Sequence, residues 1–234
     1  MERFREPVRM SLRDWPAPER PREKLLAAGV QALSDAEILA LLLGSSHLPG
    51  SNVVDLARGL LNRHGSLRAL LSAGAGVLLQ ERGLGPAAYC RLEAALELAR
   101  RHYGEALRVG PVLDSPAAIH RYLVARLRDQ PYELFCCLHL DNRHHLIAFE
   151  ELFRGTIDGA SVHPREVLRQ ALARNAAAVV LVHNHPSGTA EPSAADQFIT
   201  RRLSDALALL DIRVLDHLIV ADTGCVSFVE RGLL

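Results

Sequence analysis

The spacing of hydrophobic residues changes along the chain, and this change divides it into two regions. From Pro21 to about His102 the apolar positions recur every three or four residues, as they do on amphipathic helices. In the second half they occur in short runs and alternations that are typical of strands. The segment Arg108-Val109-Gly110-Pro111 has the composition of a linker. We therefore predict a helical region over residues 1–110 and a second domain over residues 111–234.

Capping residues mark where helices of the first region begin and end. Ser34 and Glu37 have the spacing of a capping box, in which each side chain bonds the backbone N–H of the other residue. Gly44 follows the apolar run and ends that helix. Further short helices are predicted at residues 53–64 and 66–72.

The second region combines strands and helices. Strands at residues 133–140 and 145–153 are joined by the turn Asp141-Asn142-Arg143, which favours a hairpin. Ser115-Pro116 begins a helix that ends at Leu127. The remaining predicted elements are strands at residues 176–182, 213–220 and 226–229 and helices at residues 164–175 and 193–210. Hairpins together with strand–helix alternation predict an α/β domain, a mixed β-sheet packed with helices.

A glycine-containing turn lies near the end of the helical region, within residues 76–102. Its sequence, Gly83-Leu84-Gly85 between two helical segments, resembles the helix-hairpin-helix of DNA-binding proteins. Glycines at such a turn let backbone N–H groups approach a phosphate closely. Gly83, Gly85, Arg82 and Arg91 are therefore candidate nucleic-acid contacts. The alternative is a compact helical hairpin used only for packing or for protein contact, because a glycine between helices needs no ligand.

The charge balance limits how strongly the chain binds nucleic acid. Lys plus Arg (27) equals Asp plus Glu (27), so no overall basicity attracts a phosphate backbone. Because non-specific DNA binding rests on several phosphate contacts, we expect at most weak, non-specific binding through the N-terminal region.

The terminus and the cysteines favour a cytoplasmic protein. Residues 1–6 carry charges where a signal peptide needs an apolar centre. No apolar run approaches the roughly 18 residues of a membrane helix, so no membrane association is predicted. Cys136 and Cys137 are adjacent and Cys90 and Cys225 are isolated, so there is no C-x-x-C pair. We predict reduced thiols in the protein core.

Two histidines and a carboxylate form the strongest chemical pattern in the chain. His183 and His185 follow the predicted strand at residues 176–182, and side chains at positions i and i+2 of a strand point to the same face. Asp196 lies at the start of the next helix. Two imidazoles and one carboxylate suit a zinc ion that keeps its fourth position for water. The alternative is structural, because Ser193 and Asp196 also have the spacing of a capping box.

These residues resemble the JAMM motif of the JAB/MPN metalloproteases, in which His-x-His precedes a Ser and an Asp at the spacing of Ser193 and Asp196. Flanking segments resemble the RadC-like branch of that family, and the resemblance covers about residues 12–234. The segments are Pro21-Arg22-Glu23-Lys24-Leu25-Leu26, Leu152-Phe153-Arg154-Gly155-Thr156, His163-Pro164-Arg165-Glu166-Val167, Asn175-Ala176-Ala177-Ala178, His183 to Gly188 and Leu215-Asp216-His217.

The resemblance implies a JAB/MPN-like fold and a zinc-dependent hydrolase of peptide or isopeptide-like amide bonds. It places one Zn²⁺ per chain on His183, His185 and Asp196. Ser193 occupies the position of a serine that stabilises the oxyanion of the tetrahedral intermediate. Glu133 matches a glutamate that takes a proton from the zinc-bound water, whose pKa falls to about 7, and delivers it to the leaving amine.

Several alternatives stay open at the level of sequence. Glu150 and Glu151, in the neighbouring strand, are rivals of Glu133 as the general base. His217 is expected to be a core or edge histidine, with the alternative that it orients a metal ligand. The competing functions are a DNA-associated binding module with a structural or vestigial zinc site and a repair role, and a metal-dependent nuclease. The protein or peptide substrate and the oligomeric state are not encoded in these motifs.

Overall fold

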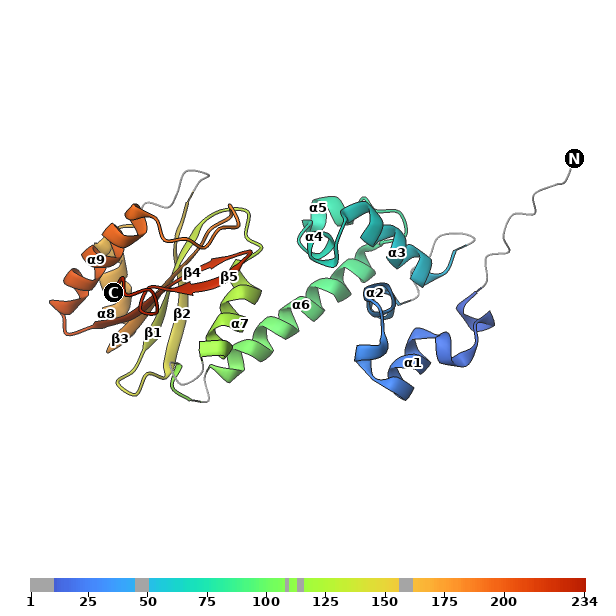
Figure 1. Cartoon of the computed structure of the whole chain (residues 1–234), viewed down its shortest axis with the longest axis horizontal. Helices are drawn as coiled ribbons and strands as arrows, with labels where there is room; N and C mark the ends of the chain where they lie inside the picture. The colour runs from blue at the N-terminus through green and yellow to red at the C-terminus, as the bar shows by residue number, and fades with distance from the viewer. Residues whose placement is uncertain (1–10, 45–50, 108–109, 113–115, 156–161) are drawn as a thin grey trace, which may run out of the picture. The chain divides into compact units, whose positions relative to one another are not determined.

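The computed structural model describes residues 11–44, 51–107, 110–112, 116–155 and 162–234. The chain forms two compact units, residues 1–97 and 98–234, which are treated separately below (Figure 1). The division falls within helix α6 (Pro86–Ala106), before the predicted linker. Of that linker, Arg108 and Val109 lie outside the described residues, as do residues 1–6 and the predicted helix start at Ser115.

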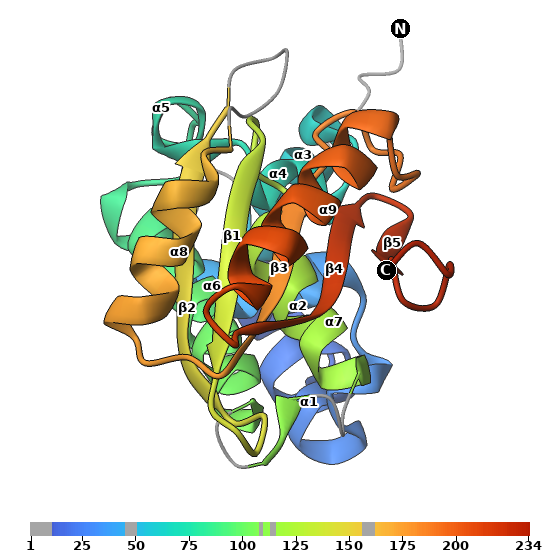
Figure 2. The same ribbon diagram turned by 90° about the vertical axis from the view of Figure 1, so that its left-hand side faces the viewer.

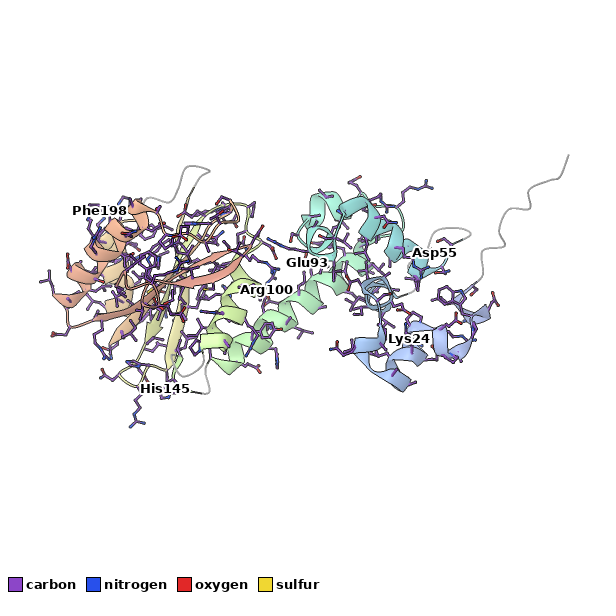
Figure 3. The ribbon with its side chains drawn as sticks, in the orientation of Figure 1. Lys24, Asp55, Glu93, Arg100, His145 and Phe198 are labelled. Carbon is purple, nitrogen blue, oxygen red and sulfur yellow. The ribbon has the colours of Figure 1, made fainter. Side chains whose placement is uncertain are left out.

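The end of α6 belongs to the second unit because its side chains pack there. Leu107 is buried in a core cluster of that unit, and Tyr103 packs against the same cluster. Arg100, labelled in Figure 3, donates a hydrogen bond from Nε to the backbone oxygen of Ala125 at 3.2 Å. Helix α6 therefore contributes to both units and ends at Ala106, before the predicted linker.

The first unit is helical, as predicted. Its helices are α1 (Pro21–Ala28), α2 (Asp35–Leu43), α3 (Val53–His64), α4 (Leu67–Leu71), α5 (Gly74–Leu78) and the first part of α6, with 3₁₀ turns at Leu12–Asp14, Ala17–Glu19 and Val30–Ala32. Its core is largely leucine and alanine, including Leu39, Leu43, Leu60, Leu70 and Leu92. A core with so few aromatic residues agrees with their low share of the sequence, 5%.

The capping box of α2 is confirmed. The Ser34 side chain accepts from the N–H of Glu37, and the Glu37 carboxylate accepts from the N–H of Ser34 at 2.8 Å. Lys24 Nζ lies 2.9 Å from the same carboxylate (Figure 3). Gly44 ends the helix with φ of 65°, a left-handed conformation that favours glycine. These bonds satisfy backbone groups that the first turn of a helix leaves open.

The second unit is built on a five-stranded mixed sheet, which confirms the predicted α/β class. Its strands are β1 (Leu134–Leu140), β2 (Leu146–Arg154), β3 (Ala178–Asn184), β4 (Arg213–Ala221) and β5 (Gly224–Ser227), in the order β2-β1-β3-β4-β5. β3 and β4 are parallel, and the other neighbouring pairs are antiparallel. The predicted hairpin is β1–β2, and its turn holds His144 at φ of 62°.

Helices cover both faces of this sheet (Figure 2). Helices α8 (Pro164–Ala173) and α9 (Ala194–Ala208) lie on one face and α7 (Pro116–Leu127) on the other. Alternate residues of β1 and β3 enter the two cores, because successive side chains of a strand point to opposite faces. Cys137, Val179 and Leu181 pack under α8 and α9, whereas Val180 and Val182 pack under α7. Both faces of β1 and β3 are therefore buried.

Strand ends differ from the prediction by a few residues. β3 covers Ala178–Asn184 where residues 176–182 were predicted, and β5 covers Gly224–Ser227 where residues 226–229 were predicted. The first case matters for the site, because β3 includes His183 and Asn184. Among the described residues, no helix is both long enough and apolar enough to cross a membrane.

All four cysteines are free thiols, but one of them is not in the core. Cys136 and Cys137 are fully buried, which raises the pKa of both thiols, and burial raises the pKa of Cys225 to about 12. Cys90 is exposed, which corrects the predicted core location of this residue.

Because the thiolate is the reactive form, we expect Ellman's reagent to label one thiol quickly in the native protein and four in denaturant. Fast labelling that persists in a Cys90→Ser variant would contradict this.

Candidate metal centre

The end of β3 places both histidines on the same face of the sheet. His183 is the penultimate residue of β3 and is 1% exposed, and His185 follows the strand and is partly exposed. The His185 N–H donates to the backbone oxygen of Val220 at 2.8 Å, which continues the pairing of β3 with β4 past the strand end. The side chain of His185 is therefore held in line with that of His183.

The first turn of α9 supplies the carboxylate. Ser193 is the N-cap of α9, and its capping box with Asp196 is confirmed: Ser193 N lies 2.8 Å and Ser193 Oγ 2.6 Å from Asp196 Oδ2. These two donors engage Oδ2 and leave Oδ1 facing His183 Nε2. Asp196 is thus both the third helical residue of the capping box and a candidate ligand, because the capping bonds fix the carboxylate that faces the imidazoles.

The three side chains converge on a volume small enough for one metal ion. His183 Nε2 and His185 Nε2 are 2.9 Å apart, and they lie 3.2 and 3.6 Å from Asp196 Oδ1 and Oδ2. One ligand atom from each residue falls within 4.8 Å of the others, which makes this the His-His-Asp group suited to a metal in the described part of the chain. The structure therefore assembles the predicted ligands.

Each histidine is held from behind by a hydrogen bond to its Nδ1. His185 Nδ1 lies 2.8 Å from the backbone oxygen of Thr189. That oxygen only accepts, so Nδ1 carries the hydrogen and Nε2 of the neutral ring presents a lone pair to the centre. His183 Nδ1 lies 2.8 Å from His217 Nε2. His217 is a buried core histidine, as predicted, and it also contacts a candidate ligand.

The electrostatics of the cluster favour a bound positive charge. Burial alone would raise the pKa of Asp196, but hydrogen bonds from His183 and His185 outweigh it and hold that pKa far below its usual range. The hydrogen bond with Asp196 raises the pKa of His185, and the charge of Glu133 adds to the effect. Burial and then the charge of His183 lower the pKa of His217, so its ring is neutral.

The donor set fits zinc. Two imidazole nitrogens and one carboxylate oxygen are ligands that Zn²⁺ accepts, and three protein ligands leave a fourth position for water or substrate. Lone pairs of neighbouring nitrogen and oxygen atoms repel each other unless a proton or a cation lies between them. A zinc ion would relieve this repulsion at all three atoms.

Glu133 lies immediately before β1, on the face that carries the histidines. In the antiparallel pairing of β1 with β3, Phe135 is opposite His183, and continuing that register by two residues places Glu133 opposite His185. The ring of Phe135 stacks on that of His183 with 6.2 Å between centroids. Residues directly opposite in such a pair share a face of the sheet, so this register favours the predicted place of Glu133 beside the cluster.

Asn184 fixes the backbone on both sides of Glu133. Its Oδ1 accepts from the N–H of Leu134 at 2.7 Å, and its Nδ2 donates to the backbone oxygen of Tyr132 at 3.0 Å. The oxygen of Glu133 itself accepts from the N–H of Gly155 at 2.8 Å. Sequence reasoning found no role for Asn184, because nothing local marks a contact across fifty residues.

The two rivals of Glu133 are occupied elsewhere. Glu151 is exposed and pairs with Arg126 of α7, at 3.2 Å, on the face away from the histidines. Glu150 forms an ion pair with Arg174, and its other oxygen lies 3.1 Å from His139 Nε2. His139 is fully buried further along β1. Glu133 therefore stays the predicted base.

One of the four N-terminal candidates for nucleic-acid contact is engaged in the helical fold. Gly83 has φ of 87°, the conformation expected of a glycine turn, and Arg82 beside it is exposed. Arg91 is engaged in the fold: its guanidinium donates to the backbone oxygens of Leu42 (2.7 Å) and Leu43 (2.5 Å), which are orphan acceptors at the end of α2. DNA binding by Gly83, Gly85 and Arg82 stays a prediction, and Arg91 has a structural role.

Comparison with known sequences matches both parts of the chain. The model of the RadC-like JAB domain matches residues 113–233, and the UPF0758 N-terminal model matches residues 12–90. This chain belongs to the UPF0758 family. UPF0758 proteins from Thioalkalivibrio sulfidiphilus and Nitrosococcus oceani are 63% and 62% identical to it, over 96% of this chain and all of theirs. One from Azotobacter vinelandii is 58% identical over the same share. The predicted RadC-like resemblance of this UPF0758 protein is confirmed.

Proposed function

We propose that this chain is a zinc-dependent hydrolase of peptide or isopeptide-like amide bonds, of the JAMM metalloprotease type. The observation that carries the proposal is the convergence of His183, His185 and Asp196, and the charge of Glu133 acts on His185 of this cluster. The RadC-like JAB domain supports it, because the resemblance of that domain to JAMM metalloproteases implies a metal at this position.

His183, His185 and Asp196 would hold the ion. Bound zinc would supply Lewis acidity, which polarises a carbonyl group and lowers the pKa of a water molecule to about 7. His183 contributes a nitrogen from the buried side of the site, whereas His185 and Asp196 are partly exposed. A substrate therefore approaches from the side of His185 and Asp196, and the sheet excludes water behind His183.

Two further side chains complete the proposed chemistry. Glu133 accepts a proton from the attacking water and delivers it to the nitrogen of the scissile amide, which then leaves as an amine. Asn184 keeps the backbone of Glu133 in place during both transfers. Ser193 stabilises the negative oxygen of the tetrahedral intermediate with its hydroxyl, which turns from Asp196 Oδ2 to do so.

Oxygen-18 labelling tests hydrolysis with generic peptides in place of the natural substrate. Zinc-loaded protein is incubated in H₂¹⁸O with peptides of linear sequence and with peptides branched through a lysine Nε amide. We expect products whose new carboxyl group carries one ¹⁸O atom. Treatment with a chelator should stop their formation, and added zinc should restore it. A fully zinc-loaded protein that forms no labelled product from either class contradicts the proposal.

A further inference from the structure

A chain of hydrogen bonds runs behind His183 into the core of the second unit. His183 Nδ1 lies 2.8 Å from His217 Nε2, and His217 Nδ1 lies 2.6 Å from Thr200 Oγ1. Thr200 Oγ1 in turn lies 2.5 Å from the backbone oxygen of Asp196. His217 and Thr200 are fully buried and His183 nearly so, so no water competes for these contacts.

The fold brings these residues together from three elements. His217 lies on β4, where it is paired with Leu181 of β3, two residues before His183 on the same face. Thr200 lies one turn after Asp196 on the buried side of α9, whereas Phe198 faces outward and is 57% exposed (Figure 3). The ring of Phe228 stacks on that of His217 with 4.7 Å between centroids. Phe228 thus covers the face of the His217 ring, and the two ring nitrogens at its edge form the hydrogen bonds.

The direction of the hydrogen bonds is set at the Thr200 end. A backbone oxygen has no hydrogen, and two oxygen atoms 2.5 Å apart repel unless a hydrogen lies between them. The Thr200 hydroxyl must therefore donate to the oxygen of Asp196. The hydroxyl has only one hydrogen, so Thr200 Oγ1 must act as the acceptor in its contact with His217. His217 therefore carries its hydrogen on Nδ1 and donates it to Thr200 Oγ1.

The remaining assignments follow from this one. A neutral imidazole has one hydrogen, so His217 Nε2 accepts, and His183 must donate from Nδ1. His183 Nε2 then keeps its lone pair, which faces His185 Nε2 at 2.9 Å and Asp196 Oδ1 at 3.2 Å. The opposite direction would put a hydrogen on His183 Nε2, where the metal binds, and would leave the 2.5 Å contact without a hydrogen.

We infer that Thr200 and His217 are positioning residues that hold His183 in the tautomer able to bind the metal of the proposed hydrolase. The chain of hydrogen bonds joins two candidate ligands, His183 at one end and Asp196 at the other. The backbone oxygen of Asp196 orients Thr200, and the carboxylate of Asp196 faces His183. The inference depends on the proposed function for the identity of the metal and does not depend on amide hydrolysis.

A pair of variants at position 200 separates hydrogen bonding from packing. Thr200→Val keeps the shape of the side chain and removes the hydroxyl, whereas Thr200→Ser keeps the hydroxyl. Loss of a partner behind a ligand lowers metal affinity by about 10- to 100-fold, so we expect a loss of that size for valine and near-parent affinity for serine. Zinc affinity is measured by competition with a chromophoric chelator, and circular dichroism checks that each variant is folded.

Nitrogen-15 NMR of the imidazole rings tests the same inference in metal-free protein. We expect hydrogen on Nδ1 of both His183 and His217 in the parent, and loss of that pattern at His217 in folded Thr200→Val. Equal zinc affinities of the valine and serine variants, or hydrogen on Nε2 of His217 in the parent, would overturn the inference. A parent protein that shows the expected tautomers and hydrolyses no amide contradicts the proposed function alone.

Discussion

Replacing Glu133 by glutamine is expected to lower the rate of amide hydrolysis by about 10²- to 10⁴-fold, the usual contribution of a positioned general base. Glutamine keeps the size and hydrogen-bonding capacity of the side chain but accepts no proton at neutral pH. Because Glu133 is not one of the three converging ligands, zinc content should stay at one ion per chain. The rate of ¹⁸O incorporation and the zinc content, measured on the same preparation, check this result.

Glu151→Gln is the matched control for this experiment. Glu151 lies on the neighbouring strand, is exposed, and pairs with Arg126 on the opposite face of the sheet. Its replacement changes the net charge by the same amount and should leave the rate within a factor of about two, because surface changes of this kind cost little. If Glu133→Gln cleaves as fast as the parent, the base is assigned to the wrong residue. The inactive variant also suits capture of the natural substrate.

Replacing His183 by alanine is expected to abolish zinc retention. The change removes one of three ligands and leaves His217 Nε2 without its partner in a fully buried position. Zinc that binds only the folded state stabilises it by about 4 kcal/mol when its concentration is a thousand times the Kd. Unfolding in denaturant is measured with and without zinc. Zinc should increase the free energy of unfolding of the parent protein and should leave that of His183→Ala unchanged.

His102→Ala provides the control for the loss of a histidine. His102 is exposed on α6 and contacts the neighbouring Tyr103. This variant should bind one zinc ion and keep the full zinc-dependent stabilisation. Elemental analysis of His183→Ala that still finds one zinc per chain would place the ion elsewhere.

The parts of the fold that were predicted correctly depend on local signals. Ser34 and Glu37, within four residues of each other, determine the start of α2. Asn52 caps the start of α3, and Gly65 caps its end. The ends of β3 depend on distant partners instead. Asn184 is polar, so the apolar run suggests that the strand ends earlier, but its amide is satisfied by Tyr132 and Leu134. The strand therefore continues to residue 184.

The same distinction applies to the candidate site. The ligands and Ser193 were found because their spacing along the chain carries the signal. The contributions of His217 and Thr200 were missed or undervalued, because each depends on a side chain brought from another element. A signal for His217 was present in the sequence, since a histidine within an apolar strand needs a polar partner.

The amide of Asn184 also has a consequence for how the two central strands align. A slip of β1 against β3 by one residue would turn Glu133 to the other face of the sheet, away from both histidines. Hydrophobic alternation alone does not specify the register of β1 and β3, because both faces of these strands are buried. The Asn184 amide does specify it, since its two partners lie on either side of Glu133 at 2.7 and 3.0 Å and a slip would break both hydrogen bonds. Asn184 thus fixes the alignment of the two strands in which the proposed base and the candidate ligands share a face.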